Sequence, residues 1–295
     1  MNDKRKICFV TPTLQMGGME RVVSLLSNYA AKNGYDVYII CLMSKKSYYD
    51  LDDNVTVLEP AFKYKKGLLN KAKVFYHLSS CLFKIRPSVV LSFSEVFNPL
   101  SIITARLANV PVYISDRSNP KKKLSLLTQR LRKLTYPLAK GMISQTELAK
   151  SISLDKGYNN NITVIPNPLR EINDNIERIK EPVIISVGRL VSTKNYKELI
   201  DIFFEIENKK EWQLWILGDG PNRNDLQEYI NDLKLNDKVT LFGAVKDVDS
   251  YLSKASIFAF PSISEGFPNA LSEAIAYPLP CIAYDCPAGP ADLIK

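Results

Sequence analysis

The sequence predicts an α/β protein of two domains, each built on a parallel sheet with helices on both faces. One observation is the length, because 295 residues exceed what a single hydrophobic core usually organises. Another is the alternation of short apolar runs with helical stretches, which is typical of parallel strands joined by helices. The polar run 171–180 predicts a linker between a first domain, 1–170, and a second domain, 181–295.

Seven apolar runs predict the strands of the first domain. They are Lys6–Thr11, Asp36–Leu42, Val55–Leu58, Ser88–Ser92, Val110–Ser115, Gly141–Ser144 and Ile162–Ile165. The first run leads into a turn with Gly17 and Gly18, followed by a helical pattern through Ala31. Glycines there let the backbone approach a ligand, and the helix start can receive a phosphate. A Gly-Gly turn also serves as a simple tight connection, and this one lacks the spaced glycines of a dinucleotide site.

A lysine-rich helical stretch between Tyr64 and Arg86 allows two interpretations. Its apolar residues recur at near-helical spacing, with seven Lys and Arg residues interleaved from Lys63 to Arg86, which suits a helix lying on a membrane surface. The alternative is a surface helix packed on its own sheet. The same choice applies to the cations at 121–123 and 130–133. His77, the only histidine, falls inside this stretch, so a packed or exposed side chain is favoured over a catalytic one.

The second domain opens with a strand, 182–188, that ends beside two cations. Arg189 emerges from the carboxyl end of this strand and Lys194 begins the next helix. Ligands bind beyond the carboxyl ends of parallel strands, so the two side chains can neutralise a nucleoside diphosphate. A further strand ends in glycines at Gly218, and strands are also predicted at 238–242 and 256–260. Asp247 is interpreted as the cap of a helix over 248–255, not as half of a metal site.

Two carboxylates lie eight positions apart in the stretch 261–273. The pattern places Glu265 in a loop and Glu273 on the helix that Pro268 begins. The backbone N–H groups of Asn269, Ala270 and Leu271 have no helical partner at such a start, which suits a phosphate or sugar oxygen. Two carboxylates can bind two vicinal diols, one on a hexose and one on a ribose. On spacing alone, a Glu265 that merely ends a strand and a solvated Glu273 remain the alternative.

Charge differs between the two domains. Residues 1–170 carry 26 Lys and Arg against 11 Asp and Glu, a net +15, whereas the remainder carries 13 against 20, a net −7. A basic first domain favours anionic lipid headgroups, polyphosphates or nucleic acid, or simply solubility. The five cysteines are scattered, which suits reduced buried thiols. Neither a signal peptide nor a membrane-spanning run is recognised, so a cytoplasmic protein is expected.

Several of these residues together resemble retaining glycosyltransferase family 4. Glu265 and Glu273 match its motif of two glutamates separated by seven residues, and 276–290 also fits its pattern. Gly17-Gly18-Met19-Glu20-Arg21 matches its amino-terminal loop, Asn167 its Pro-Asn hinge, and Arg189 with Lys194 its diphosphate-binding pair. The resemblance implies a GT-B fold: two facing Rossmann-like domains, with the acceptor bound to the first and a nucleotide sugar mainly to the second.

The resemblance also implies roles for individual residues. Glu265 would contact donor-sugar hydroxyls and Glu273 the ribose, with Gly218 near the base. Gly17, Gly18, Gly266, Phe267 and the start of the following helix, Asn269 to Leu271, would complete the donor site. Asp116, followed by Arg117, occupies the position where relatives place an acceptor-side histidine or acid. The donor would be UDP- or GDP-linked and the transfer retaining, with the departing phosphate taking the acceptor proton. No metal or cofactor is expected.

The resemblance leaves the acceptor open. The basic first domain suits a polyprenyl-diphosphate-linked or other saccharide, with peripheral contact to the anionic inner face of the plasma membrane, as in surface polysaccharide or lipopolysaccharide biosynthesis. Competing interpretations are a nucleotide-sugar epimerase and a nucleic-acid-binding module, although no aromatic-basic repeat supports nucleic acid. A third is an inactive fragment, because the sequence stops at Lys295 inside an expected helix, whereas relatives continue.

Overall fold

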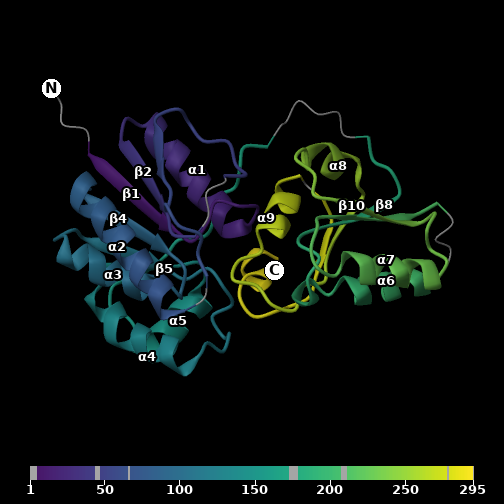
Figure 1. Cartoon of the computed structure of the whole chain (residues 1–295). Coiled ribbons are helices and arrows are strands. Elements are labelled where there is room, and N and C mark those ends of the chain that lie inside the picture. The colour runs from purple at the N-terminus through teal and green to yellow at the C-terminus, as the bar shows by residue number, and fades with distance from the viewer. Residues whose placement is uncertain are drawn as a thin grey trace. The chain divides into compact units, whose positions relative to one another are not determined.

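The computed structural model describes residues 5–43, 47–65, 67–172, 179–206, 211–277 and 279–294. It divides into two compact units, Met1–Pro168 and Leu169–Lys295. Each unit is α/β and contains one parallel sheet, which confirms the predicted fold class (Figure 1). Most of the predicted linker, residues 173–178, lies outside the described residues.

The first unit contains a seven-stranded sheet in the order β3-β2-β1-β4-β5-β6-β7, and every pairing is parallel. The strands are β1 (Lys6–Thr11), β2 (Asp36–Cys41), β3 (Val55–Leu58), β4 (Val89–Phe93), β5 (Val112–Ser115), β6 (Gly141–Ser144) and β7 (Ile162–Val164). Each lies within two residues of its predicted bounds. The strand order reverses between β1 and β4, so a crevice is expected at the carboxyl ends of these two strands.

Helices cover both faces of this sheet. They are α1 (Gly18–Lys32), α2 (Leu68–Ile85), α3 (Asn98–Leu107), α4 (Leu126–Thr135) and α5 (Glu147–Asp155), with a short 3-10 turn, η1, at Tyr136–Leu138. Alternate residues of a strand point to opposite faces. Accordingly, Cys8 and Val10 of β1 share a core cluster with α2 and α3, whereas Phe9 packs in a second cluster with α1.

The second unit repeats this plan with five parallel strands in the order β10-β9-β8-β11-β12. They are β8 (Val183–Val187), β9 (Gln213–Leu217), β10 (Val239–Gly243), β11 (Ile257–Phe260) and β12 (Cys281–Ala283). The helices are η2 (Ser192–Lys194), α6 (Tyr196–Glu205), α7 (Arg223–Asp232), α8 (Asp249–Lys254), α9 (Asn269–Ala276) and α10 (Pro290–Leu293). One core cluster packs α6 and α7 on the sheet, and the other packs α8 and α9. Here the strand order reverses between β8 and β11.

Two glycines bring the loops after β8 and β9 into backbone contact. Gly218 has φ +139°, a conformation that residues with a side chain rarely adopt. A Cβ at this position would overlap the carbonyl oxygen of Gly188. This close approach fixes the loop that carries Arg189 against the neighbouring strand end.

Candidate functional site

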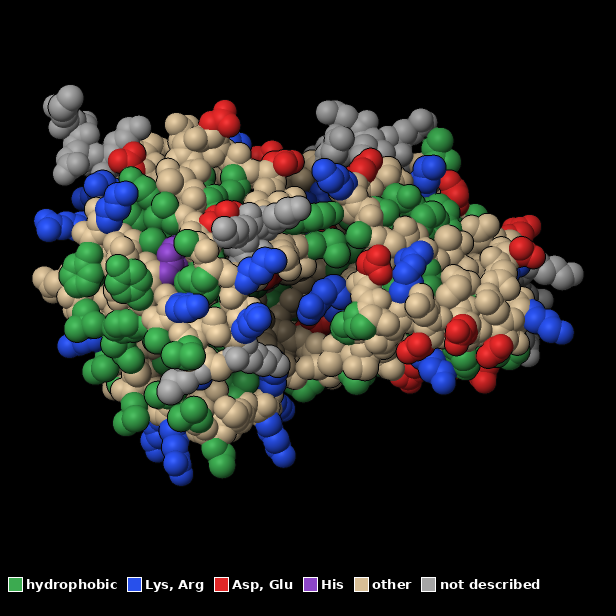
Figure 2. All heavy atoms as spheres, in the orientation of Figure 1, with side chains coloured by type: hydrophobic (Ala, Val, Ile, Leu, Met, Phe, Trp, Pro, Cys, Tyr) green, Lys and Arg blue, Asp and Glu red, His purple; other side chains and the backbone are tan. Residues whose placement is uncertain are grey.

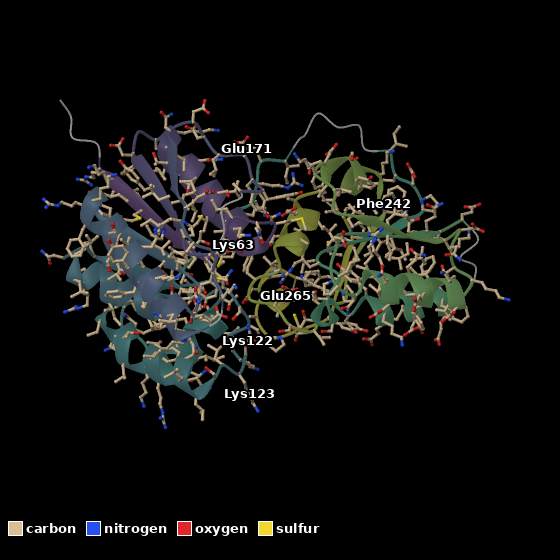
Figure 3. All side chains as sticks on the ribbon, viewed as in Figure 1. Lys63, Lys122, Lys123, Glu171, Phe242 and Glu265 are labelled. Carbon is tan, nitrogen blue, oxygen red and sulfur yellow. The ribbon has the colours of Figure 1, made fainter. Side chains whose placement is uncertain are left out.

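Lys194 and Glu265 meet where β8 and β11 end. Lys194 closes η2 after β8, and Glu265, labelled in Figure 3, lies in the loop between β11 and α9. Lys194 Nζ donates to Glu265 Oε1 at 2.6 Å, and the side chains are only 18% and 11% exposed. None of the described residues donates a hydrogen bond to the other carboxylate oxygen, Oε2. The pair therefore holds a cation in place and leaves one acceptor oxygen open.

Arg189 supplies a second cation at the same strand end. Its residue is exposed, directly follows Gly188, and its side chain makes no hydrogen bond or ion pair with any part of the chain that the structure describes. The absence of a side chain at Gly188 leaves space for Lys194. A Cβ at position 188 would lie 2.8 Å from the Tyr196 hydroxyl and 3.3 Å from Lys194 Cε. The prediction that Lys194 begins the next helix is wrong, because Lys194 closes the 3-10 turn η2 and α6 begins at Tyr196.

The start of α9 lies next to this pair in the chain. Phe267 is buried, Gly266 is half-buried, and the Asn269 amide donates to the Phe267 carbonyl at 3.0 Å. Across the described ranges, no acceptor is recorded for the backbone N–H groups of Ala270 and Leu271. Two first-turn amides are thus available at the positive end of a helix of eight residues.

Glu273 lies on α9, as predicted, but the alternative of a solvated side chain is wrong because the residue is only 3% exposed. Its Oε2 accepts from Arg170 Nε at 3.2 Å, and Arg170 also pairs with Asp249. Burial opposes the charge on Arg170, but the two carboxylates outweigh it and raise the pKa of the guanidinium. Sequence reasoning missed Arg170, whose partners lie 79 and 103 positions away.

Asp247 serves as a helix cap, as predicted. Its Oδ1 accepts from the amide of Ser250, at 3.2 Å, in the first turn of α8. Asp249 is occupied by Arg170, so these two aspartates do not face a common point. Among the described residues, no group of three or more His, Cys, Asp and Glu is arranged to hold a metal ion.

The glycine pair of the first unit precedes α1. The Gly17 amide donates to the Tyr49 hydroxyl at 3.1 Å, and the same hydroxyl donates to the Gly17 carbonyl at 2.7 Å. A Cβ at Gly17 would overlap the carboxylate of Glu20, which accepts from Thr13 Oγ1 at 2.9 Å. Gly17 therefore makes room for Glu20, and its own amide is engaged within the unit. Gly18 is the first residue of the helix.

Asp116 follows β5 and is held by three side chains. Its Oδ1 accepts from the Tyr136 hydroxyl at 2.7 Å and from Asn98 Nδ2 at 3.0 Å, while Oδ2 pairs with Arg132. Burial opposes the charge on Arg132, but the neighbouring Asp116 carboxylate outweighs it and raises the pKa of that guanidinium. Both oxygens of Asp116 are thus occupied inside the unit. The adjacent Arg117 lies over the Phe93 ring and donates to Asn167.

Two groups that sequence reasoning assigned to packing are confirmed in that role. His77 lies on α2 and is half-buried, with Nε2 3.2 Å from the Cys41 carbonyl oxygen, and burial lowers its pKa. All five cysteines are free. Burial raises the pKa of Cys286 to about 11 and that of Cys281 to about 11, so both thiols stay protonated near neutral pH.

Comparisons with known proteins agree in both units. The family model described as glycosyl transferases group 1 matches residues 170–295, and the model described as glycosyltransferase family 4 matches residues 16–170, more than half of the chain. The chain is 28% identical, over 95% of its length and 80% of the relative's, to the amylovoran biosynthesis glycosyltransferase AmsD of Erwinia amylovora.

A second relative comes from Campylobacter jejuni, and the fold also matches solved structures. The GalNAc-alpha-(1->4)-GalNAc-alpha-(1->3)-diNAcBac-PP-undecaprenol alpha-1,4-N-acetyl-D-galactosaminyltransferase of that organism is 27% identical over 98% of the chain and 82% of its own length. Anabaena Alr3699/HepE, solved in complex with UDP and glucose, superposes with a TM-score of 0.82 at 16% identity, covering 99% of this chain and 83% of that one. These matches favour a transferase over an epimerase.

Proposed function

Because the chain belongs to the glycosyl transferases of group 1 and family 4, we propose that it moves a hexose-type sugar from a nucleotide sugar to a saccharide acceptor in surface polysaccharide or lipopolysaccharide biosynthesis. The relatives named above act in amylovoran biosynthesis and on an undecaprenol-diphosphate-linked saccharide, which supports an acceptor of that class. The UDP and glucose bound to Alr3699/HepE make a UDP-linked donor the first to test, with a GDP-linked donor second.

The observation that carries the proposal is the pairing of Lys194 with Glu265 beside an unengaged Arg189. Two cations at the carboxyl end of β8 suit the two phosphates of a nucleoside diphosphate. Glu265 holds Lys194 through Oε1 and keeps Oε2 for a hydroxyl of the donor sugar. One carboxylate can therefore orient the phosphate-binding cation and the sugar together.

The reaction breaks the bond between sugar C1 and the diphosphate oxygen and forms a bond from C1 to an acceptor oxygen. Negative charge grows on the leaving diphosphate, and Arg189, Lys194 and the Ala270 and Leu271 amides would stabilise it. The acceptor oxygen attacks the face of C1 from which the diphosphate departs and gives its proton to that phosphate, so the configuration at C1 is retained. With this arrangement the transfer needs neither a side-chain base nor a metal.

Glu273 would bind the ribose hydroxyls of the donor. Arg170 already fixes its carboxylate from one side, so the side chain does not have to be ordered when the nucleotide binds. Gly218 lies at the end of β9, where it lets the loops pack closely enough for a flat base to approach the backbone.

Calorimetric titration of the full chain with UDP, GDP and ADP tests donor binding. Replacing Arg189 by Ala removes one charge-assisted contact, worth about 1.5–3 kcal/mol, so the Kd should rise about 10- to 100-fold. Lys254→Ala is the matched control, because Lys254 is an exposed cation of the same unit. Equal Kd values for the two variants would refute the phosphate role of Arg189. Excess EDTA should leave binding and transfer unchanged.

We further propose that the first unit rests on the anionic inner face of the plasma membrane. No helix within the described ranges has the length and apolar character to cross a bilayer, so this contact would be peripheral. On α2, the inner residues Val74, Leu78 and Leu82 are fully buried, which confirms packing on the sheet, but Tyr76 and Phe83 are 76% and 52% exposed. The inner side of α2 therefore packs on the sheet, and its exposed outer side is the one that we propose for the membrane contact.

The exposed apolar side chains continue from α2 onto its neighbours, with basic residues around them (Figure 2). We call this surface the α2–α4 face. Its exposed apolar residues are Leu69, Tyr76, Phe83, Ile103, Leu107, Leu126, Leu127 and Leu134, and its exposed basic residues include Lys71, Lys73, Lys84, Arg106, Arg130 and Lys133. Apolar side chains ringed by cations complement an anionic lipid surface.

Flotation with liposomes tests this contact. Wild type should float with vesicles of phosphatidylcholine and phosphatidylglycerol more than with phosphatidylcholine alone. A triple variant with Leu69, Tyr76 and Phe83 each replaced by Ser should float several-fold less, whereas a variant with Ile202 and Ile275, exposed in the second unit, replaced by Ser should float as wild type does. Equal failure to float with both vesicles would remove the membrane from the proposal.

A further inference from the structure

Glu95 occupies the position in the first unit where a parallel sheet usually binds its ligand. It follows β4 at the carboxyl end, and β4 lies next to β1, where the strand order reverses. Ligands of open α/β sheets bind outside the carboxyl ends of strands at such a reversal. Sequence reasoning did not single out Glu95, because it follows a strand without a glycine or a recognised motif.

The backbone turns sharply just before this residue. Ser94 has φ +124°, which is rare for any residue other than glycine, and its carbonyl accepts from the amides of Phe97 and Asn98 at 3.1 and 2.8 Å. A conformation of this kind is unfavourable, persists only where surrounding structure enforces it, and is concentrated at binding sites. The turn sets the direction in which Glu95 leaves the strand.

The carboxylate of Glu95 is nearly buried and only half satisfied. The residue is 9% exposed, and Oε1 accepts from Ser118 Oγ at 2.7 Å and lies 3.7 Å from Lys122 Nζ. Throughout the described part of the chain, Oε2 receives no hydrogen bond. Because Oε2 is the part of this carboxylate that reaches solvent, a hydroxyl of a ligand can donate to it there, in a charge-assisted hydrogen bond.

A hollow that is open to solvent adjoins this carboxylate. Glu95, Ser118, Asn119, Lys122 and the paired Asp116 and Arg132 line it. Lys122, labelled in Figure 3, is exposed in the loop between β5 and α4. Because Asp116 and Arg132 are bound to each other, Glu95 and Lys122 are the charged groups of this lining that can turn to a ligand.

We propose that Glu95 is the acceptor-binding carboxylate, accepting a hydrogen bond from a hydroxyl of a saccharide through Oε2. This inference rests on the proposed function for the identity of its ligand, and it moves the acceptor-side role from Asp116 to Glu95. The carboxylate positions the acceptor and takes no proton, because in the proposed transfer that proton goes to the leaving phosphate. Lys122 adds a cation that favours a saccharide carrying an anionic group.

Saccharide binding can be measured without turnover. Saturation-transfer NMR of the full chain with methyl glycosides of glucose, galactose and their N-acetylated amino sugars reports direct contact. Glu95→Gln keeps the shape of the side chain and removes its charge, so the saturation transferred to the best glycoside should fall at least several-fold. Glu147→Gln, an exposed acid on α5 of the same unit, is the matched control and should behave as wild type.

Kinetics with the same variants separates acceptor binding from other roles. With a lipid-diphosphate-linked saccharide as acceptor, Glu95→Gln should raise the acceptor KM about 10- to 100-fold and leave the UDP Kd unchanged. Equal saturation transfer from Glu95→Gln and wild type, or none from wild type, would overturn the proposal. If the acceptor proposal fails in this way while the UDP Kd is unchanged, the donor half of the proposed function still stands. If wild type does not bind UDP at all, the proposed function itself is refuted.

Discussion

Asp116 in the first unit and Glu265 in the second are both carboxylates that follow a strand at its carboxyl end, yet their surroundings differ. Their side chains are similarly buried, 15% and 11% exposed, and each pairs with a cation. Asp116 receives hydrogen bonds on both oxygens, from Arg132, Tyr136 and Asn98. Glu265 receives one, from Lys194, on one oxygen.

The difference shows that position at a strand end and burial do not by themselves identify a binding carboxylate. What distinguishes Glu265 is an oxygen that no described residue uses and a partner cation that is itself placed for a phosphate. Glu95 shares the first property with Glu265, and Asp116 does not. By this criterion, we assign Asp116 to the stability of the fold and propose Glu265 and Glu95 as the ligand-binding carboxylates.

The largest expected effect is on stability. Asp116→Asn should lower the free energy of unfolding by about 3–5 kcal/mol, because it leaves the nearly buried Arg132 without its counter-charge. Both tryptophans, Trp212 and Trp215, lie in the second unit, so their fluorescence during urea unfolding follows that unit while circular dichroism follows both. The dichroism transition should move to lower urea. An unshifted transition together with a lost activity would instead make Asp116 a ligand-binding residue.

The next effect is on rate. Lys194→Met should lower kcat by about 10²- to 10³-fold, equivalent to about 2.7–4 kcal/mol, because it removes a charge that faces the developing negative charge of the leaving diphosphate. Glu265→Gln should lower kcat/KM in the same direction by a smaller factor. Steady-state transfer assays measure both, with Lys254→Met as the charge-matched control for Lys194→Met and Glu147→Gln as that for Glu265→Gln. If the Lys194 and Glu265 variants lose stability but keep their transfer rates, this pair stabilises the fold, as expected of Asp116 and Arg132, and does not act in the reaction.

The smallest effect is a dependence of stability on pH that resides in the first unit. Burial lowers the pKa of His77 from 6.5, so the unfolded chain binds the proton more readily than the folded chain. The free energy of unfolding should therefore fall as the pH drops below about 6.5 and through the folded-state pKa of His77. Above pH 6.5, this histidine should not change the stability. His77→Gln should reduce the difference in the free energy of unfolding between urea titrations at pH 5.5 and at pH 7.5.

The histidine can be followed directly, because it is the only one in the chain. Its imidazole proton signals in NMR should titrate with a midpoint below 6.5. A midpoint above 6.5 would mean that the Cys41 carbonyl, which favours the protonated ring, outweighs burial at this position.

The fold was largely predictable because both of its signals are local. Apolar runs of four to seven residues mark the strands of a buried parallel sheet, and the turns between them supply the boundaries. Lys6–Thr11, Val55–Leu58 and Gly141–Ser144 coincide with observed strands for this reason. The proximity of Lys194 and Glu265 followed from the same logic, since both were expected at carboxyl ends of strands in one sheet, but their ion pair was not predicted.

Side-chain partners across the sequence were not predictable. Nothing near Asp116 indicates that Tyr136, 20 positions later, and Asn98, 18 positions earlier, would occupy it. The sequence places Arg170 at the end of the first domain, before a polar linker, although it binds Glu273 and Asp249 of the second unit. Glu95 was not predicted either, because its significance lies in a carboxylate oxygen to which no described residue donates. A sequence does not show which oxygens lack a donor.

The contact between Gly188 and Gly218 limits how this enzyme can be redesigned. A library meant to change its donor preference should leave both glycines untouched, because a methyl group at Gly218 would overlap the carbonyl oxygen of Gly188, and one at Gly188 would crowd the side chains of Tyr196 and Lys194. Substitutions are better made at side chains that project from those loops. The contacts to the sugar or base then change while the backbone of the loops stays the same.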